Sequence, residues 1–178
     1  MDLAICSLAS GSSGNCYLVR TPSAAVLVDA GISARQARAD AAANTERYLT
    51  QLGVELETEI PVDTAMMPVL YVRIEKGGGQ GVYDGHGVEL SGGGEDYYAV
   101  PDKRGDTRAE TITASRALQL LVGRLDSEQL SGLKIEDIEL VFWVDRSGLG
   151  AGEAEDTAVP AWKITTNKGI YYIEAYEN

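Results

Sequence analysis

The chain has few of the residues that a metal centre or a disulfide-stabilised fold requires. Its 178 residues include one histidine, His86, and two cysteines, Cys6 and Cys16. Cysteines at this spacing match neither a disulfide framework nor a zinc-ligand motif. The sequence also has no apolar run of the ~20 residues that a membrane-spanning helix needs, and residues 1–6 lack the basic start of a signal peptide. We therefore expect reduced thiols, no metal or other cofactor, and a cytoplasmic location.

Basic residues are also scarce. The chain has 15 Lys and Arg against 27 Asp and Glu, which gives a net charge of −12. Such a surface repels the phosphates of nucleic acids and of anionic lipids, so we expect neither nucleic acid nor a membrane surface as a partner. The acids are spread along the chain, which favours a charged, well-solvated surface. A dedicated site for a basic protein partner is the alternative.

One local pattern predicts a long helix near the N-terminus. Residues 33–36 read Ser-Ala-Arg-Gln, the spacing of a capping box, and an alanine-rich stretch follows to about Leu52. Gly53 then lies where helices often end in a left-handed residue. Residues 44–46 read Asn-Thr-Glu, which leaves open a second helix start within this stretch.

A second helix is expected after Thr113 or Ser115, since either side chain can cap it. Apolar residues follow at positions i, i+3, i+4 and i+7, which places them on one side of a helix. These residues are Leu118, Leu121, Val122 and Leu125.

Apolar stretches of strand length predict a sheet. The expected strands are 2–8, 16–20, 24–28, 69–74, 97–100, 138–144, 162–166 and 170–176. In 138–144 the residues alternate, so at least one face should be buried. Asp84-Gly85 predicts a hairpin turn, and residues 167–169 predict another. Residues 101–110 and 145–158 are polar, so we expect loops there. Together these elements predict an α+β fold: an antiparallel sheet with a long N-terminal helix and a second, amphipathic helix packed on it.

The stretch from Ser7 to Val19, followed by Leu27-Val28-Asp29-Ala30-Gly31, resembles the opening of metallo-β-lactamase-fold hydrolases of the Wal/Yyc-operon type. In that family a β-hairpin leads into the fold. The family's metal centre needs a His-x-His-x-Asp-His cluster and further histidines, whereas this chain has His86 alone. The resemblance covers residues 3–36 and carries over no metal ligand, so we expect this part to be non-catalytic.

Four later segments form a helix followed by strands: Ala114–Leu121, Ile138–Asp145, Val159–Ile164 and Tyr171–Tyr176. This series is similar to the C-terminal part of YycH and YycI type regulatory proteins, which accompany a WalK-type sensor histidine kinase. The resemblance implies a non-catalytic, extracytoplasmic domain with a PepSY-like or cystatin-like curved sheet, which regulates a kinase by contact.

The two resemblances predict two parts, residues 1–36 and residues 37–178. Proteins of the YycH and YycI type begin with a membrane-anchoring helix, and here a hydrolase-like stretch takes that place. A natural fusion, a rearranged reading frame and a designed composite all remain open as origins of such a chain.

The function predicted from these patterns is regulation or binding by protein–protein contact, without catalysis. The resemblance to YycH and YycI type proteins implies that this contact takes place in a two-component signalling system, on a sensor histidine kinase. Two alternatives stay open. One is an acidic inhibitor or mimic that occupies a basic site on another protein. The other is an inactive remnant of a metallo-β-lactamase-fold hydrolase.

Aromatic side chains of the last strands are the candidate contact residues. Alternation along a strand turns some of them inward and leaves others on an open face, where aromatic residues suit protein contact. The acidic residues Glu153, Glu155 and Asp156 are expected to border that face. The hypothesis predicts that Trp162→Ala loses binding without unfolding. The candidates are Trp143, Trp162, Tyr171, Tyr172 and Tyr176.

Three weaker signals have simpler explanations. Asp84 and His86 suggest a metal site, but Asp-Gly is a hairpin turn and two ligands are too few. The loop from Ser10 to Asn15 could bind an anion through its backbone N–H groups, but no helix start or lysine completes such a site. Cys6 and Cys16 have no neighbouring base in the sequence, so we expect buried small side chains.

Overall fold

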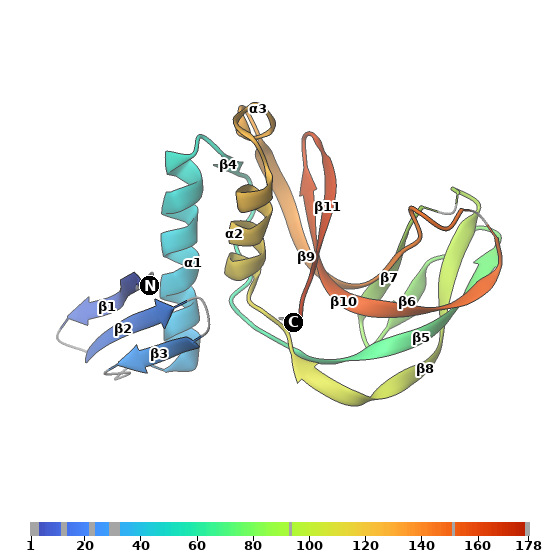
Figure 1. The fold of residues 1–178 in the computed structure, drawn as a ribbon, viewed down its shortest axis with the longest axis horizontal. Helices are drawn as coiled ribbons and strands as arrows, with labels where there is room; N and C mark the ends of the chain where they lie inside the picture. Colours follow the sequence, from blue (N-terminus) through green and yellow to red (C-terminus); the bar gives the residue numbers. More distant parts are fainter. Residues whose placement is uncertain are drawn as a thin grey trace.

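The computed structural model describes residues 4–11, 14–21, 24–28, 33–92, 94–150 and 152–176, and strands hold more than twice as many of these as helices (Figure 1). The strands are β1 (Ala4–Gly11), β2 (Gly14–Thr21), β3 (Ala24–Val28), β4 (Glu55–Leu56), β5 (Met66–Lys76), β6 (Gly81–Tyr83), β7 (His86–Ser91), β8 (Tyr97–Glu110), β9 (Lys134–Asp145), β10 (Ala154–Thr166) and β11 (Gly169–Glu174). The helices are α1 (Ala34–Gln51), α2 (Ala114–Arg124) and α3 (Ser127–Leu130).

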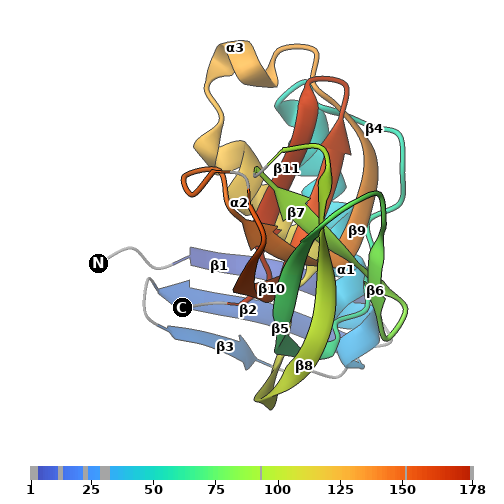
Figure 2. The same cartoon turned by 90° about the vertical axis from the view of Figure 1, so that its right-hand side faces the viewer.

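The main sheet curls into a nearly closed barrel (Figures 1 and 2). Its strands follow the order β6-β7-β9-β10-β5-β8, with β11 paired to β10 and β4 paired to β9. The last strand of this order, β8, comes back into contact with β6 and β7. Strand β9 runs parallel to β4 and β7, so the sheet is mixed rather than antiparallel as predicted.

The predicted α+β fold class was wrong, because the chain is mostly β. Part of the error lies in two segments that were expected to be loops. Residues 101–110 belong to β8, and residues 154–158 begin β10. Both are polar, and both pair with β5 over most of their length. A strand's backbone gains its hydrogen bonds from its neighbour whatever side chains it carries, so the tertiary pairing overrides the polar composition.

Strands β1, β2 and β3 form a separate antiparallel sheet in that order, close to the predicted positions. Helix α1 contacts β1 on one side and α2 on the other. Polar contacts also join α1 to the rest of the chain. Among them, Arg38 pairs with Glu110 at 3.2 Å, and Gln119 donates to Thr45 at 3.1 Å. The predicted boundary after residue 36 falls in the first turn of α1, and the division into two parts stays a prediction.

Both predicted helices are present. The Ser33 side chain accepts the Gln36 backbone N–H at the start of α1, whereas the Gln36 side chain donates to Asp40 instead of completing the capping box. The helix continues through residues 44–46, and Gly53 follows with a φ of +76°. Thr113 caps α2.

No helix within the described ranges is long and apolar enough to span a membrane.

Two apolar clusters form the core, and the long strands β9 and β10 connect them. The first lies between α2 and the sheet and includes Leu118, Trp162 and Ile173. The second fills the barrel and includes Leu70 and Phe142. Strands β9 and β10 contribute residues to both clusters, so the core fixes which of their residues point inward. The residues between these point to the opposite face of the sheet.

Candidate functional site

Alternation along β9 defines an inner and an outer face of the sheet. Residues 138, 140, 142 and 144 point into the two apolar clusters, as the sequence pattern predicted. The residues between them, among them Glu139, Val141 and Trp143, therefore point to the outer face. On the neighbouring strands, the residues paired with these positions share that face.

Trp143 and Tyr172 stack on the outer face. Their ring centroids are 5.2 Å apart and the ring planes differ by 1°. The indole Nε1–H of Trp143 also donates a 2.7 Å hydrogen bond to the Ser91 hydroxyl on β7. Both rings are half-buried. Offset-stacked and edge-to-face aromatic pairs contribute about 0.5–1.5 kcal/mol beyond their buried area. Together with the hydrogen bond to Ser91, this contact favours one arrangement of the Trp143 ring.

The stacked rings cover two small residues of the same face. Val141 and Ala161 pair directly across β9 and β10, between the positions of Trp143 and Tyr172. They point outward, yet Val141 is 3% exposed and Ala161 is fully buried. The aromatic pair is therefore anchored on an apolar base, which keeps its rings together in the free protein.

Lys163 lies beside the aromatic pair. It stands across from Glu139 on β9 and Tyr172 on β11. Its ammonium group lies 2.8 Å from the Glu89 carboxylate and 3.9 Å from that of Glu139. Burial lowers the pKa of Lys163, but the hydrogen bond and charge of Glu89 outweigh it, so its pKa lies above the ordinary value.

The Tyr172 phenol belongs to the same group. Burial, and then the negative charge of Glu89, raise the pKa of Tyr172 above its ordinary value, while Lys163 opposes the rise. The phenol therefore stays neutral at physiological pH and can donate a hydrogen bond. We call the set Glu89, Ser91, Trp143, Lys163 and Tyr172 the outer aromatic site.

The other three aromatic candidates do not belong to this site. Trp162 is 2% exposed in the core and donates from Nε1 to the Ile112 carbonyl oxygen at 2.9 Å. The prediction that it forms a contact face was wrong, because even-numbered residues of this part of β10 point inward. Tyr171 packs against the cluster under α2. The Tyr176 hydroxyl donates to the Met67 carbonyl, and burial raises the pKa of Tyr176.

Sequence reasoning found two members of the outer aromatic site and missed Glu89, Ser91 and Lys163. Glu89 and Ser91 reach it because β7 pairs in parallel with β9, with Glu89 across from Trp143. Nothing in the sequence indicates that pairing. Lys163 did carry a signal, since a lysine between Trp162 and Ile164 within a strand marks the solvent side.

The weaker candidates stay apart from this site. Asp84 and Gly85 have φ of 51° and 83°, which confirms the tight hairpin turn. His86 is half-buried, with Nδ1 2.9 Å from the Leu140 carbonyl oxygen and its ring edge-on to Phe142. Within the described parts of the chain, no three His, Cys, Asp or Glu side chains gather where they could hold a metal.

The two cysteines differ in exposure. Cys16 is buried as expected, whereas Cys6 is exposed. The candidate anion loop between Ser10 and Asn15 includes residues 12 and 13, which lie outside the described residues.

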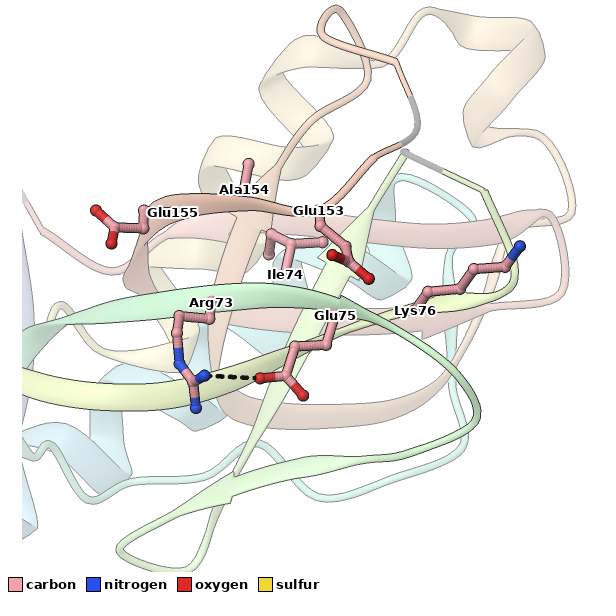
Figure 3. Close-up of a pocket in the computed structure, with 7 residues that line it drawn as sticks. All are labelled: Arg73, Ile74, Glu75, Lys76, Glu153, Ala154 and Glu155. Carbon is pink, nitrogen blue, oxygen red and sulfur yellow. Dashed lines mark ion pairs between the residues drawn. The ribbon is translucent and has the colours of Figure 1, made fainter.

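An open hollow lies between β5 and the start of β10 (Figure 3). In it, Arg73 pairs with Glu75 at 3.1 Å. Figure 3 shows Lys76 and Glu155 pointing away from that pair, so the charges do not converge on one point. The seven residues that line the hollow are Arg73, Ile74, Glu75, Lys76, Glu153, Ala154 and Glu155. The third acidic residue of the predicted border, Asp156, lies 3.6 Å from the largely buried Arg146.

The outer aromatic site thus combines a rigid aromatic pair, a lysine and a glutamate on four adjacent strands, and it can offer both apolar contact and charged hydrogen bonds to a ligand. No family model matches this chain, and no curated protein and no solved structure matches it.

Proposed function

We propose that this chain is a non-catalytic binding module that acts by protein–protein contact through the outer aromatic site. The stacked pair of Trp143 and Tyr172 carries the proposal. The pair is half-buried, so part of each ring remains open to a partner. Tryptophan and tyrosine are, with arginine, the residues enriched among those that dominate binding energy at protein interfaces.

The fixed arrangement of the pair supports this role. Ser91 holds the Trp143 indole, and the apolar base of Val141 and Ala161 lies under the rings. A partner therefore meets side chains that are already ordered, and binding loses less conformational entropy than it would with free rotamers.

Charges beside the rings can give the contact its selectivity. Lys163 and Glu89 are each mostly buried, and they satisfy one another in the free chain. A partner that covers them must match this pair with its own polar groups, because an unmatched buried charge is costly. This favours a protein surface with an apolar centre and polar surroundings over a purely charged ligand.

The resemblance to YycH and YycI type proteins makes the extracytoplasmic domain of a WalK-type sensor kinase the first partner to test. Calorimetric titration of that domain into the wild-type chain should give saturable binding with weak dependence on salt. Tyr172→Ala should weaken it by roughly tenfold or more, the loss typical of a central aromatic contact. Tyr48→Ala is the matched control, because Tyr48 is exposed on α1.

Two results would count against the proposal. One is absence of binding at high protein concentration. The other is a Tyr172→Ala variant that keeps its circular dichroism spectrum and its full affinity, which would move the contact elsewhere.

The net charge of −12 favours a second candidate, an acidic inhibitor that occupies a basic site on another protein. Binding through exposed charges weakens steeply as salt screens them. The same titration at low and moderate salt separates the two, since a steep loss of affinity would favour the acidic surface and a small loss the outer aromatic site.

A further inference from the structure

Strand β11 forms an edge of the main sheet. Within the described residues, its strand pairing is with β10 alone, from Ala161↔Glu174 to Thr166↔Gly169. The edge is therefore open to another strand.

One hydrogen bond fixes which backbone groups of β11 face outward. The Ala175 N–H donates to the Pro160 carbonyl oxygen on β10 at 2.8 Å. Backbone groups alternate in direction along an antiparallel strand, so residues 173 and 171 also bond towards β10. Ile170, Tyr172 and Glu174 then direct their N–H and C=O groups away from β10, to the open edge.

This edge lacks the usual protection against pairing. Proteins block exposed edges with lysine, proline, bulges or a covering segment. The sequence from Gly169 to Ile173 has no charge and no proline, and its isoleucines and tyrosines favour strands. Ile170 is 52% exposed although it is a large apolar side chain. Pairing with another strand would satisfy the outward backbone groups and bury this side chain.

We propose that two copies of this chain pair through β11, antiparallel and about a two-fold axis at Tyr171. Ile170 of each copy then lies opposite Tyr172 of the other, and both have outward backbone groups. Two such pairs exchange four backbone hydrogen bonds. The same register places Lys168, in the turn before β11, opposite Glu174 of the other copy, twice in the dimer. In the dimer the Lys168 ammonium exchanges its bonds to carbonyls at the end of α3 for the Glu174 carboxylate.

The side chains select this register over its neighbours. An axis at Tyr172 sets the apolar Ile170 opposite the charged Glu174. An axis at Ile170 sets Tyr172 opposite Lys168 and leaves Glu174 opposite Thr166. Only the axis at Tyr171 combines an aromatic–aliphatic pair with an opposite-charge pair, and cross-strand pairs of both kinds stabilise a sheet.

Net charge opposes the dimer. Each copy carries −12, so two copies repel one another at low salt. At 0.1 M salt, exposed charges more than about 10 Å apart are largely screened from one another. The backbone hydrogen bonds and apolar contacts persist at that salt concentration. The dimer should therefore strengthen as salt is raised. This inference does not rest on the proposed partner, because it concerns the chain alone.

Sedimentation equilibrium of the full chain tests the proposal across a concentration series at low and high salt. The wild type should show a monomer–dimer equilibrium whose dissociation constant falls as salt rises. Ile170→Lys should raise that constant by roughly tenfold or more, because it adds charge at the pairing edge. Val82→Lys is the control, since Val82 is 59% exposed on β6, away from β11, and should dimerise like the wild type.

Charge reversal tests the register. Lys168→Glu and Glu174→Lys should each weaken the dimer, and the double variant should restore it. Lys168 also donates to three carbonyls around the end of α3, at 2.7 to 3.1 Å. The double variant loses those bonds too, so recovery would come from the charge pair. A monomer at every concentration and salt, a dimer unchanged by Ile170→Lys, or no recovery in the double variant would each overturn the proposal.

Discussion

At the scale of single residues, the five aromatic candidates divide by the direction in which their strand turns them. Trp143 and Tyr172 meet on the outer face, while Trp162 and Tyr171 face the cluster under α2. The sequence predicts that such a division exists. It does not predict which residue goes where, because the face depends on what each strand packs against.

Trp162→Ala should destabilise the fold rather than remove a binding contact. The side chain is 2% exposed and its Nε1–H bonds to a backbone carbonyl. Truncating a buried tryptophan costs about 3–5 kcal/mol, which urea unfolding would measure. Trp162→Phe keeps most of the volume and should cost less. An alanine variant of wild-type stability would contradict the burial of this ring.

Stability should fall above about pH 10, the ordinary pKa of tyrosine. Burial raises the pKa values of Tyr172 and Tyr176, and Glu89 contributes for Tyr172. Each of these tyrosines has a higher pKa in the folded state than in the unfolded state. Their contribution to stability is therefore complete below pH 10 and is lost as pH rises through the folded-state pKa values. Lys163, whose pKa is also raised, acts in the same direction.

Thermal unfolding between pH 8 and pH 11 measures this loss. Tyr172→Phe keeps the stacked ring without the ionisable hydroxyl, so its melting temperature should fall less steeply above pH 10. A variant with the same slope as the wild type would show that Tyr172 does not contribute.

At the scale of elements, local chemistry predicted the helices and turns, and tertiary pairing decided the rest. Ser33 and Thr113 cap helices where the sequence places them, and Asp84-Gly85 makes its turn. These features depend on neighbouring residues alone. Strand β8 depends on β5, a partner about thirty residues away, so its polar sequence reads as a loop.

Two glycine substitutions test this local chemistry in opposite directions. Gly85 has a φ of +83°, so Gly85→Ala should destabilise the chain by about 1–2 kcal/mol. Gly123 lies in α2 with open space around its Cβ position. Gly123→Ala should stabilise the helix by up to about 1 kcal/mol. Urea unfolding gives both values, and equal effects of the same sign would contradict the assigned backbone geometry.

At the scale of the whole molecule, the fold class could not be predicted because barrel closure joins strands from opposite ends of the sheet. Strand β8 contacts β6, and Gly81 on β6 allows the close approach. A Cβ atom at Gly81 would collide with the Ala99 carbonyl oxygen on β8. No local pattern marks this glycine, since its φ is not in the left-handed region.

Gly81→Ala should therefore destabilise the barrel by about 1–3 kcal/mol, the usual cost of overpacking. Gly87 on the adjacent strand is the matched control, because a Cβ there would make only ordinary contacts at 3.8 and 3.9 Å. Hydrogen exchange should show the loss of protection concentrated in β6 and β8 for Gly81→Ala. Equal effects of the two substitutions would contradict the closure.

The proposed contact through the outer aromatic site can be observed directly by tryptophan fluorescence. The chain has two tryptophans, so Trp162→Phe leaves Trp143 as the single reporter at the stacked pair. We would titrate this variant with the extracytoplasmic domain of a WalK-type kinase and follow both emission and quenching by acrylamide. We expect a saturable blue shift and reduced quenching, because the partner covers Trp143. Saturable binding by calorimetry without any change at Trp143 would contradict it.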